Sequence, residues 1–324
     1  MKKAMITVVV LVIAVSILVS QRHAILLHLM TGGGEPPPLL EPIDEGPDVT
    51  WFNDYFIVVP LATEAGVATY AIGEPLYAQQ NFSYLIVGEE RAILFDAGPG
   101  YRDIREVAES LTDLTITFIP SHFHYDHVGN EITFDRVAVI DLPHIRRRAV
   151  DNRLLLTWEE HLGTGEGVPA PTLRVNEWLA PDQVIDLGGR ELKVLYTPGH
   201  TNDSISLLDV RNQFLFSGDF IYPGPLYAFL PNSSLGDYAW AAENVLNTVH
   251  REMRVLGAHR NPGAGLPELS LSDVSDLSTV LERLRAGTAQ GEGTYPVSYQ
   301  VNERMVLLVE PDWLAEWELS YPEL

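Results

Sequence analysis

Six residues near the middle of the chain, HFHYDH at 122–127, constrain the fold more than any other segment. They follow the apolar run ITFIP, which predicts a buried strand, so the polar side chains come at a strand end. His122 and His124 are two apart, and side chains two apart in an extended segment point the same way. Burying three imidazoles and a carboxylate without a cation would leave costly unpaired polar groups. The segment therefore predicts a metal site.

Further polar residues stand at the ends of other predicted strands, where a rigid sheet positions groups on the following loop. They are Asp96 in FDAGPG, His200 in YTPGHT, Asp219 in FSGDF and His259 in LGAHR. Asp126 and His127 are adjacent and diverge, so they can face a second ion beside the first. At least seven candidate ligands exceed the four of a closed mononuclear site, which favours two bridged metals. Imidazoles and carboxylates suit zinc, with iron or manganese as alternatives.

The rest of the chain predicts a layered α/β fold. Strand-like runs such as SYLIVG, RAILFDAG, LKVLYTPG and QFLFSGD alternate with helical stretches such as YRDIREVAESL and LSDVSDLSTVLERLRAG. Short polar segments at 88–90 and 209–212 separate neighbouring strand-like runs and predict hairpins, so antiparallel pairing accompanies any parallel part.

The amino-terminal region predicts a separate role. Lys2 and Lys3 precede seventeen uncharged residues at 4–20, so residues 1–23 are expected to be a membrane anchor or, alternatively, a cleaved signal segment. More positive charge precedes the run than follows it, which predicts that the rest of the chain lies outside the cytoplasm. Residues 24–50 are rich in Gly and Pro and are expected to form a flexible tether, and residues 51–324 form one catalytic domain.

Charge and composition narrow the partners. The net charge of −23 argues against nucleic acid, because such binding relies on Lys and Arg at phosphates. The chain has no cysteine, which excludes disulfides and thiolate metal ligands. The membrane at the N-terminal segment is an expected partner, and the oligomeric state stays open.

The ordered series NFSYLIVGEERAILFDAGPG, SHFHYDHVGN, YTPGHTNDSISLL, FSGDF and GAH resembles the metallo-β-lactamase-fold hydrolase superfamily, over roughly residues 55–310. The resemblance implies an αββα sandwich of two mixed sheets flanked by helices, with the site at the sheet edge. It implies a first metal held by His122, His124 and His200, a second held by Asp126, His127 and His259, and Asp219 as the bridge. Asp96 matches an aspartate that supports the site from behind. The intact Asp219 resembles glyoxalase-II-like thioesterases and lactonases more than true β-lactamases.

By this resemblance, the expected activity is that of a dizinc hydrolase that cleaves an ester, thioester or lactone with a metal-bridging hydroxide. The expected partner is therefore a small molecule with a hydrolysable carbonyl. Asp126 is expected to steer the proton toward the leaving group, and Tyr222 is a candidate donor to the oxyanion. The alternatives are a β-lactamase-type amide hydrolase and an iron-dependent persulfide dioxygenase of the same fold. The segments LLLTWEEHLGTGEGVP and IYPGPLYAFLP are expected to shape the pocket and favour an apolar or acyl-bearing substrate.

Overall fold

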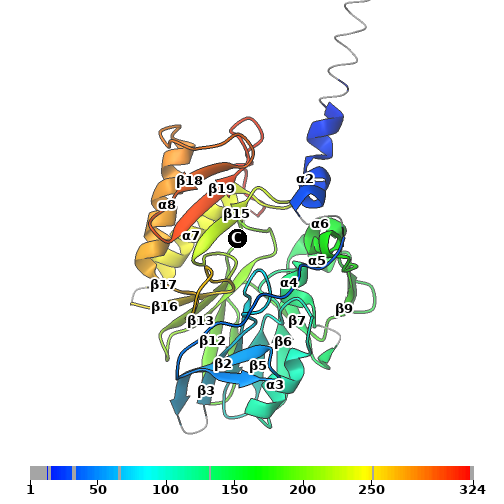
Figure 1. The fold of residues 1–324 in the computed structure, drawn as a ribbon, viewed down its shortest axis with the longest axis vertical. Helices are drawn as coiled ribbons and strands as arrows, with labels where there is room; N and C mark the ends of the chain where they lie inside the picture. The colour runs from blue at the N-terminus through cyan, green and yellow to red at the C-terminus, as the bar shows by residue number, and fades with distance from the viewer. Residues whose placement is uncertain are drawn as a thin grey trace, which may run out of the picture.

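The computed structural model describes residues 13, 16–30, 34–64, 67–130, 133–249 and 252–321. Two six-stranded sheets form its centre (Figure 1). The first sheet has the order β1 (Thr50–Phe52), β2 (Phe56–Glu64), β3 (Val67–Gly73), β4 (Phe82–Val87), β5 (Ala92–Phe95) and β6 (Ile116–Ile119). The second has the order β11 (Val184–Asp186), β12 (Glu191–Tyr196), β13 (Ile205–Asp209), β14 (Phe214–Gly218), β16 (Arg254–Gly257) and β17 (Glu268–Ser270).

Both large sheets are mixed, as predicted. The two expected hairpins are present, because β4 pairs antiparallel with β5 and β13 pairs antiparallel with β14. Parallel pairing occurs once in each sheet, between β5 and β6 and between β14 and β16. The remaining strand pairs in these sheets are antiparallel.

Side chains on the second sheet alternate between two hydrophobic cores, as the two-residue period of a strand requires. Val194 and Leu207 join the core shared with the first sheet and with helix α3 (Ile104–Leu111). Leu195 and Leu208 join a second core with α7 (Leu235–Thr248) and α8 (Leu271–Arg285). The layers therefore run helix, sheet, sheet, helix, which confirms the predicted αββα class.

Smaller elements surround the sandwich. A third sheet has the order β15 (Gly224–Ala228), β19 (Met305–Val309) and β18 (Val297–Gln300). Two strand pairs join β7 (Ala138–Ile140) to β10 (Glu177–Leu179) and β8 (Arg153–Leu155) to β9 (Thr172–Arg174). The short helices are α4 (Tyr125–Val128), α5 (Pro143–Arg146), α6 (Trp158–His161) and the 3₁₀ turn η2 (Gly163–Glu166).

The predicted membrane anchor needs correction. Within the described residues, no helix is both long enough and apolar enough to cross a membrane. Helix α2 (Arg22–Met30) has nine residues, whereas a span needs about 20. Most of the apolar run at 4–20 lies outside the described residues. The finding contradicts the transmembrane or signal segment at 1–23 and the extracytoplasmic location inferred from it.

The segment predicted as a flexible tether, 24–50, also differs from the expectation. Its first residues belong to α2, which contacts η2 and stands above α6 in Figure 1. Farther along, the Leu40 amide donates to the Leu76 carbonyl at 2.7 Å. Glu45 is buried and accepts two hydrogen bonds from Arg260, at 2.6 and 2.7 Å. We refer to α2 and residues 34–49 as the N-terminal arm, and this arm lies against the catalytic body.

We predict that Glu45→Ala destabilises the protein, because it leaves the Arg260 charge buried without its partner. The free energy of unfolding should fall by about 3 kcal/mol or more in urea denaturation. Asp182→Ala is the control, since Asp182 pairs with Lys193 on the surface and should cost about 1 kcal/mol or less. Equal effects of the two variants would contradict a docked arm.

Candidate metal centre

Four loops from the two large sheets bring the predicted ligands together. His122 and His124 follow β6 of the first sheet, and Asp126 and His127 lie in the α4 turn that comes next. From the second sheet, His200 follows β12, Asp219 follows β14 and His259 follows β16. All seven side chains are buried. The site therefore lies where loops of both sheets meet.

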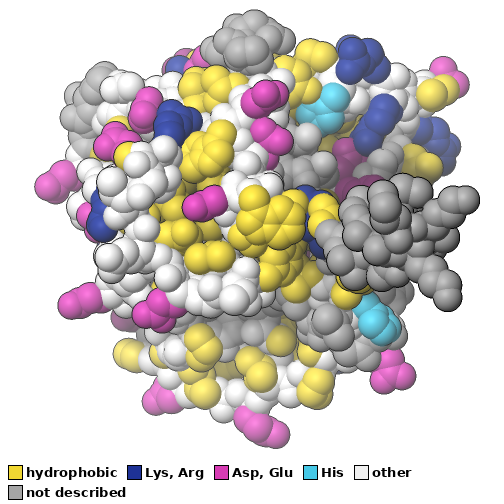
Figure 2. All heavy atoms as spheres, turned by 90° about the horizontal axis from the view of Figure 1, so that it is seen from above, with side chains coloured by type: hydrophobic (Ala, Val, Ile, Leu, Met, Phe, Trp, Pro, Cys, Tyr) yellow, Lys and Arg dark blue, Asp and Glu magenta, His cyan; other side chains and the backbone are white. Residues whose placement is uncertain are grey.

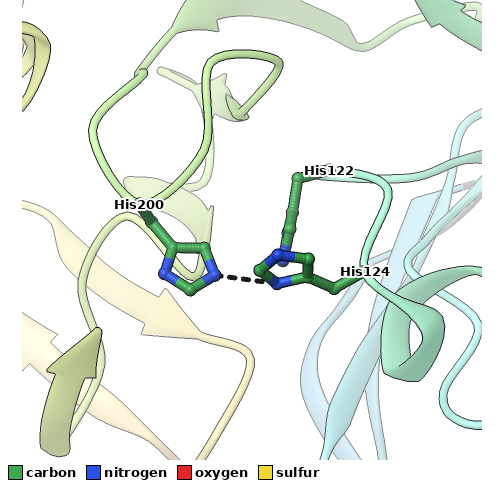
Figure 3. A group of neighbouring side chains, drawn as sticks. All are labelled: His122, His124 and His200. Carbon is green, nitrogen blue, oxygen red and sulfur yellow. Dashed lines mark hydrogen bonds between the residues drawn. The ribbon is translucent and has the colours of Figure 1, made fainter. Parts of the chain in front are cut away.

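His122, His124 and His200 form the first group. Their rings point toward one another, with His200 approaching from the side opposite the other two (Figure 3). His200 Nε2 lies 3.0 Å from His124 Nδ1, and each ring offers a nitrogen within 4.8 Å of the others. Two ligands of a tetrahedral zinc ion lie about 3.3 Å apart, so this spacing suits a common ion.

Asp126, His127 and His259 form a second group. The Oδ2 atom of Asp126 lies 3.4 Å from Nε2 of both His127 and His259. Asp219 lies between the groups. Its Oδ2 is 3.5 Å from His200 Nε2, while its Oδ1 is 3.2 Å from His259 Nε2. One carboxylate therefore has an oxygen directed at each group, as a bridging ligand requires.

The buried polar atoms of the site fit divalent cations. His122 Nε2, His127 Nε2 and Asp219 Oδ1 have no hydrogen-bond partner within the described residues. Buried polar atoms without partners are rare and each carries a desolvation cost. These atoms face the centres of the two groups, so cations bound there would satisfy them. Zinc, iron and manganese all accept this set of nitrogen and oxygen donors.

The pKa values of the site residues also bear on metal binding. Burial lowers the pKa of His122 and His124 well below the usual range, and neighbouring imidazoles lower it further. These rings are neutral and keep lone pairs for a metal. Burial opposes ionisation of Asp219, but the adjacent His259 outweighs it and holds the pKa of Asp219 below its ordinary value. Burial lowers the pKa of His259, but the Asp219 carboxylate outweighs it and holds that pKa above its usual value, so a metal bound at this ring would displace a proton.

Comparison with known proteins decides the family. A family model described as the metallo-beta-lactamase superfamily matches residues 76–287, which include all seven of these side chains. The chain belongs to the metallo-beta-lactamase superfamily.

Relatives within the superfamily include named hydrolases. The human acyl-coenzyme A thioesterase MBLAC2 is 32% identical over 227 residues, covering 60% of this chain and 79% of that protein. The hydroxyacylglutathione hydrolase of Bradyrhizobium sp. (strain ORS 278) is 28% identical over 149 residues, covering 44% of this chain and 48% of that protein. The solved metallo-beta-lactamase of Erythrobacter litoralis has a TM-score of 0.52 over 73% of this chain and 100% of its own, and at 15% identity it shows the fold alone. The chain is an enzyme, a metallo-hydrolase of this superfamily.

Hydrogen bonds from behind fix the orientation of the candidate ligands. Asp96 Oδ2 lies 3.0 Å from His127 Nδ1, which is the supporting position expected for Asp96. The other contacts join His122 Nδ1 to Ser121 Oγ at 3.0 Å, His200 Nδ1 to the Tyr227 carbonyl at 2.7 Å, and His259 Nδ1 to the Gln79 carbonyl at 3.0 Å. Such partners set which ring nitrogen faces the metal.

Two supporting features were missed from the sequence. Asn81 donates to Asp126 Oδ2 at 3.0 Å and to the Asp126 carbonyl at 2.9 Å. Its only sequence signal is a polar residue immediately before the apolar run of β4. Glu166 is buried and accepts hydrogen bonds from the hydroxyls of Tyr77, Tyr101 and Tyr125. Since Tyr125 lies between His124 and Asp126, this network ties the metal loop to η2.

Tyr222 lies beside the site, but its hydroxyl has another partner. The hydroxyl donates to the Pro225 carbonyl at 2.6 Å, and the ring contacts His259 edge-on with 5.0 Å between centroids. To donate to an oxyanion, Tyr222 would have to give up the Pro225 bond. The position therefore differs from the one expected of a catalytic donor, and favours packing against His259.

A cavity of about 480 Å³ opens above the two groups. Its floor includes Asp126, Asp219 and His259. Both segments expected to shape the pocket contribute to its walls, through Leu162 and Leu230 among others. Residues of the N-terminal arm also line the cavity, namely Leu27, Glu35 and Pro37, and nothing in the sequence pattern predicted their place.

We predict that His122→Ala lowers both the metal-to-chain ratio and the melting temperature, because a bound metal contributes folding free energy. Elemental analysis and calorimetry on the same preparation measure the two effects. His144→Ala is the matched control, since His144 contacts Tyr321 away from the site. An unchanged metal ratio in His122→Ala would remove this residue from the ligand set.

We predict that Tyr222→Phe acts on stability more than on hydrolysis. Loss of the bond to Pro225 should cost about 1 kcal/mol of unfolding free energy. The value of kcat should fall by much less than the decrease of about 100-fold that follows removal of an oxyanion donor. A drop of that size, with stability unchanged, would restore Tyr222 as a catalytic residue.

Proposed function

We propose that this enzyme hydrolyses thioesters at a site that holds two zinc ions. The first ion would be bound by His122, His124 and His200, and the second by Asp126, His127 and His259, with Asp219 shared. The observation that carries the proposal is the Asp219 carboxylate, whose two oxygens lie 3.5 and 3.2 Å from histidines of the two different groups. The named thioesterase relative supports the choice of a thioester among the carbonyl substrates.

The bound cations would supply Lewis-acid activation of a water and of the substrate carbonyl. Water adds to the carbonyl carbon, the carbon–sulfur bond breaks, and the products are a carboxylic acid and a thiol. The proton lost by the water passes to the departing sulfur. We assign this transfer to Asp126, because it lines the cavity and Asn81 donates to its Oδ2 atom at 3.0 Å.

The surrounding residues orient this chemistry and restrict water. Asp96 and Ser121 hold the rings of His127 and His122 from behind, so the metal-facing nitrogens keep their directions. Pro223, Pro225 and Tyr227 form one wall of the cavity. Such a wall lowers the local dielectric, which strengthens the electrostatic stabilisation of a developing oxyanion.

A substrate panel tests the proposal. The zinc-loaded enzyme should show a higher kcat/KM for thioesters than for lactones, oxygen esters or β-lactams of similar size. A preference for lactones or β-lactams would contradict the thioester assignment. Oxygen consumption with a persulfide, at one iron per chain, would replace hydrolysis by dioxygenase chemistry.

We predict that Asp126→Ala lowers kcat/KM for the preferred thioester by about 1,000-fold, through loss of a ligand and of proton transfer. Far-ultraviolet circular dichroism should stay unchanged, because Asp126 contributes no apolar packing. Asp182→Ala serves as the control, since this exposed carboxylate lies at the β11 edge and pairs with Lys193. Comparable activity in Asp126→Ala and in the control would exclude the proposed role.

A further inference from the structure

Three leucines on the cavity wall belong to neither hydrophobic core. Leu27 comes from α2, Leu162 follows α6 and Leu230 follows β15, so three distant segments converge here. Leu162 is buried and the other two are partly buried, and none of the three is among the residues of either core. Apolar side chains that line a cavity present hydrocarbon surface to whatever occupies it.

Leu162 adds an independent observation, because its backbone is unfavourable for leucine. It ends α6 in the left-handed region, with φ of 57°. Glycine or asparagine usually occupies this position after a helix, since other side chains are strained there. Leu162 is only 5% exposed. Backbone strain of this kind gathers at functional sites, and here it directs an apolar side chain to the cavity.

Contacts at both of its ends hold α2 against the cavity. Glu310 accepts hydrogen bonds from Arg22 at 2.5 and 3.2 Å and lies 3.1 Å from His23. Beyond the helix, the Gly34 amide donates at 2.9 Å to the carbonyl of Gly165, which comes three residues after Leu162. Figure 2 views this end of the molecule and shows hydrophobic side chains gathered across the middle of the face. Leu27 is therefore fixed beside the cavity.

The charges around the cavity indicate what these leucines contact. Arg260 is the one Lys or Arg among the described residues that line the cavity, and Glu45 neutralises it. Glu35 and Glu166 add negative charge. An anionic group at the far end of the substrate would find no free cation on this wall. An uncharged hydrocarbon chain needs no cationic partner, so the charges of this wall do not disfavour it.

We propose that Leu27, Leu162 and Leu230 form an acyl-binding wall that selects thioesters with an uncharged hydrocarbon chain. The inference rests on the proposed thioester hydrolysis and names the class of acyl group. The family model begins at residue 76, so Leu27 lies outside the part that this chain shares with its superfamily. Each methylene buried against such a wall raises affinity about fourfold.

The test compares octanoyl and acetyl thioesters of N-acetylcysteamine, which share one small neutral thiol. Leu27→Ala and Leu162→Asn should each lower the octanoyl-to-acetyl ratio of kcat/KM about tenfold. Asn tolerates the backbone of Leu162, and Ala is a better helix former than Leu at position 27. Ile25→Ala is the control, because Ile25 lies on α2, is 42% exposed and does not line the cavity. Its ratio should match that of the unmodified enzyme.

An unchanged ratio in both cavity variants would overturn the acyl wall while leaving thioester hydrolysis intact. Titration calorimetry with octanoate and acetate on the metal-loaded proteins gives a second readout that needs no turnover. If the enzyme hydrolyses no thioester, the proposed function fails. The acyl-binding wall is still supported in that case if both variants weaken octanoate binding and leave acetate binding unchanged. Equal changes for both acids would overturn the wall.

Discussion

The buried carboxylate of Asp219 is the interaction on which the rest of the site depends. It lies between two groups of ligands, each of which combines side chains from both sheets, with one oxygen near His200 and the other near His259. A buried anion is costly unless it is paired, and here imidazoles surround it. In the metal-free site, protons on the neighbouring histidine rings balance the charge of Asp219. Cations bound at the two groups would take the place of those protons. The site therefore couples the two halves of the sandwich.

Local patterns were sufficient to predict much of the centre. The proximity of the His122 and His124 rings follows from their spacing on an extended segment, which can be read from the sequence. His200, Asp219 and His259 could be proposed because each follows a strand-like run, and the structure brings these side chains together beneath one cavity. The mixed sheets were predictable for a similar reason. The short segments at 88–90 and 209–212 can only join antiparallel neighbours, so the sheets could not be purely parallel.

Long-range contacts account for what the sequence did not reveal. Glu45 and Arg260 are 215 residues apart, so their pairing could not be inferred from the Gly- and Pro-rich composition around position 45. The Tyr222 hydroxyl bonds to Pro225, a contact set by the way β15 leaves the site. The apolar run at 4–20 predicted a membrane span, but the described helices include none of sufficient length and apolarity. Composition alone does not show which surface a segment packs against.

The N-terminal arm contributes to the wall of the cavity, whereas the candidate metal ligands come from the superfamily domain.

The most direct test of this account is a zinc titration of the metal-free enzyme that follows thioester hydrolysis and bound zinc together. Two sites that share Asp219 predict that hydrolysis rises to a plateau at two zinc ions per chain. A plateau at one ion per chain, or hydrolysis that persists in the metal-free protein, would contradict the two-ion centre.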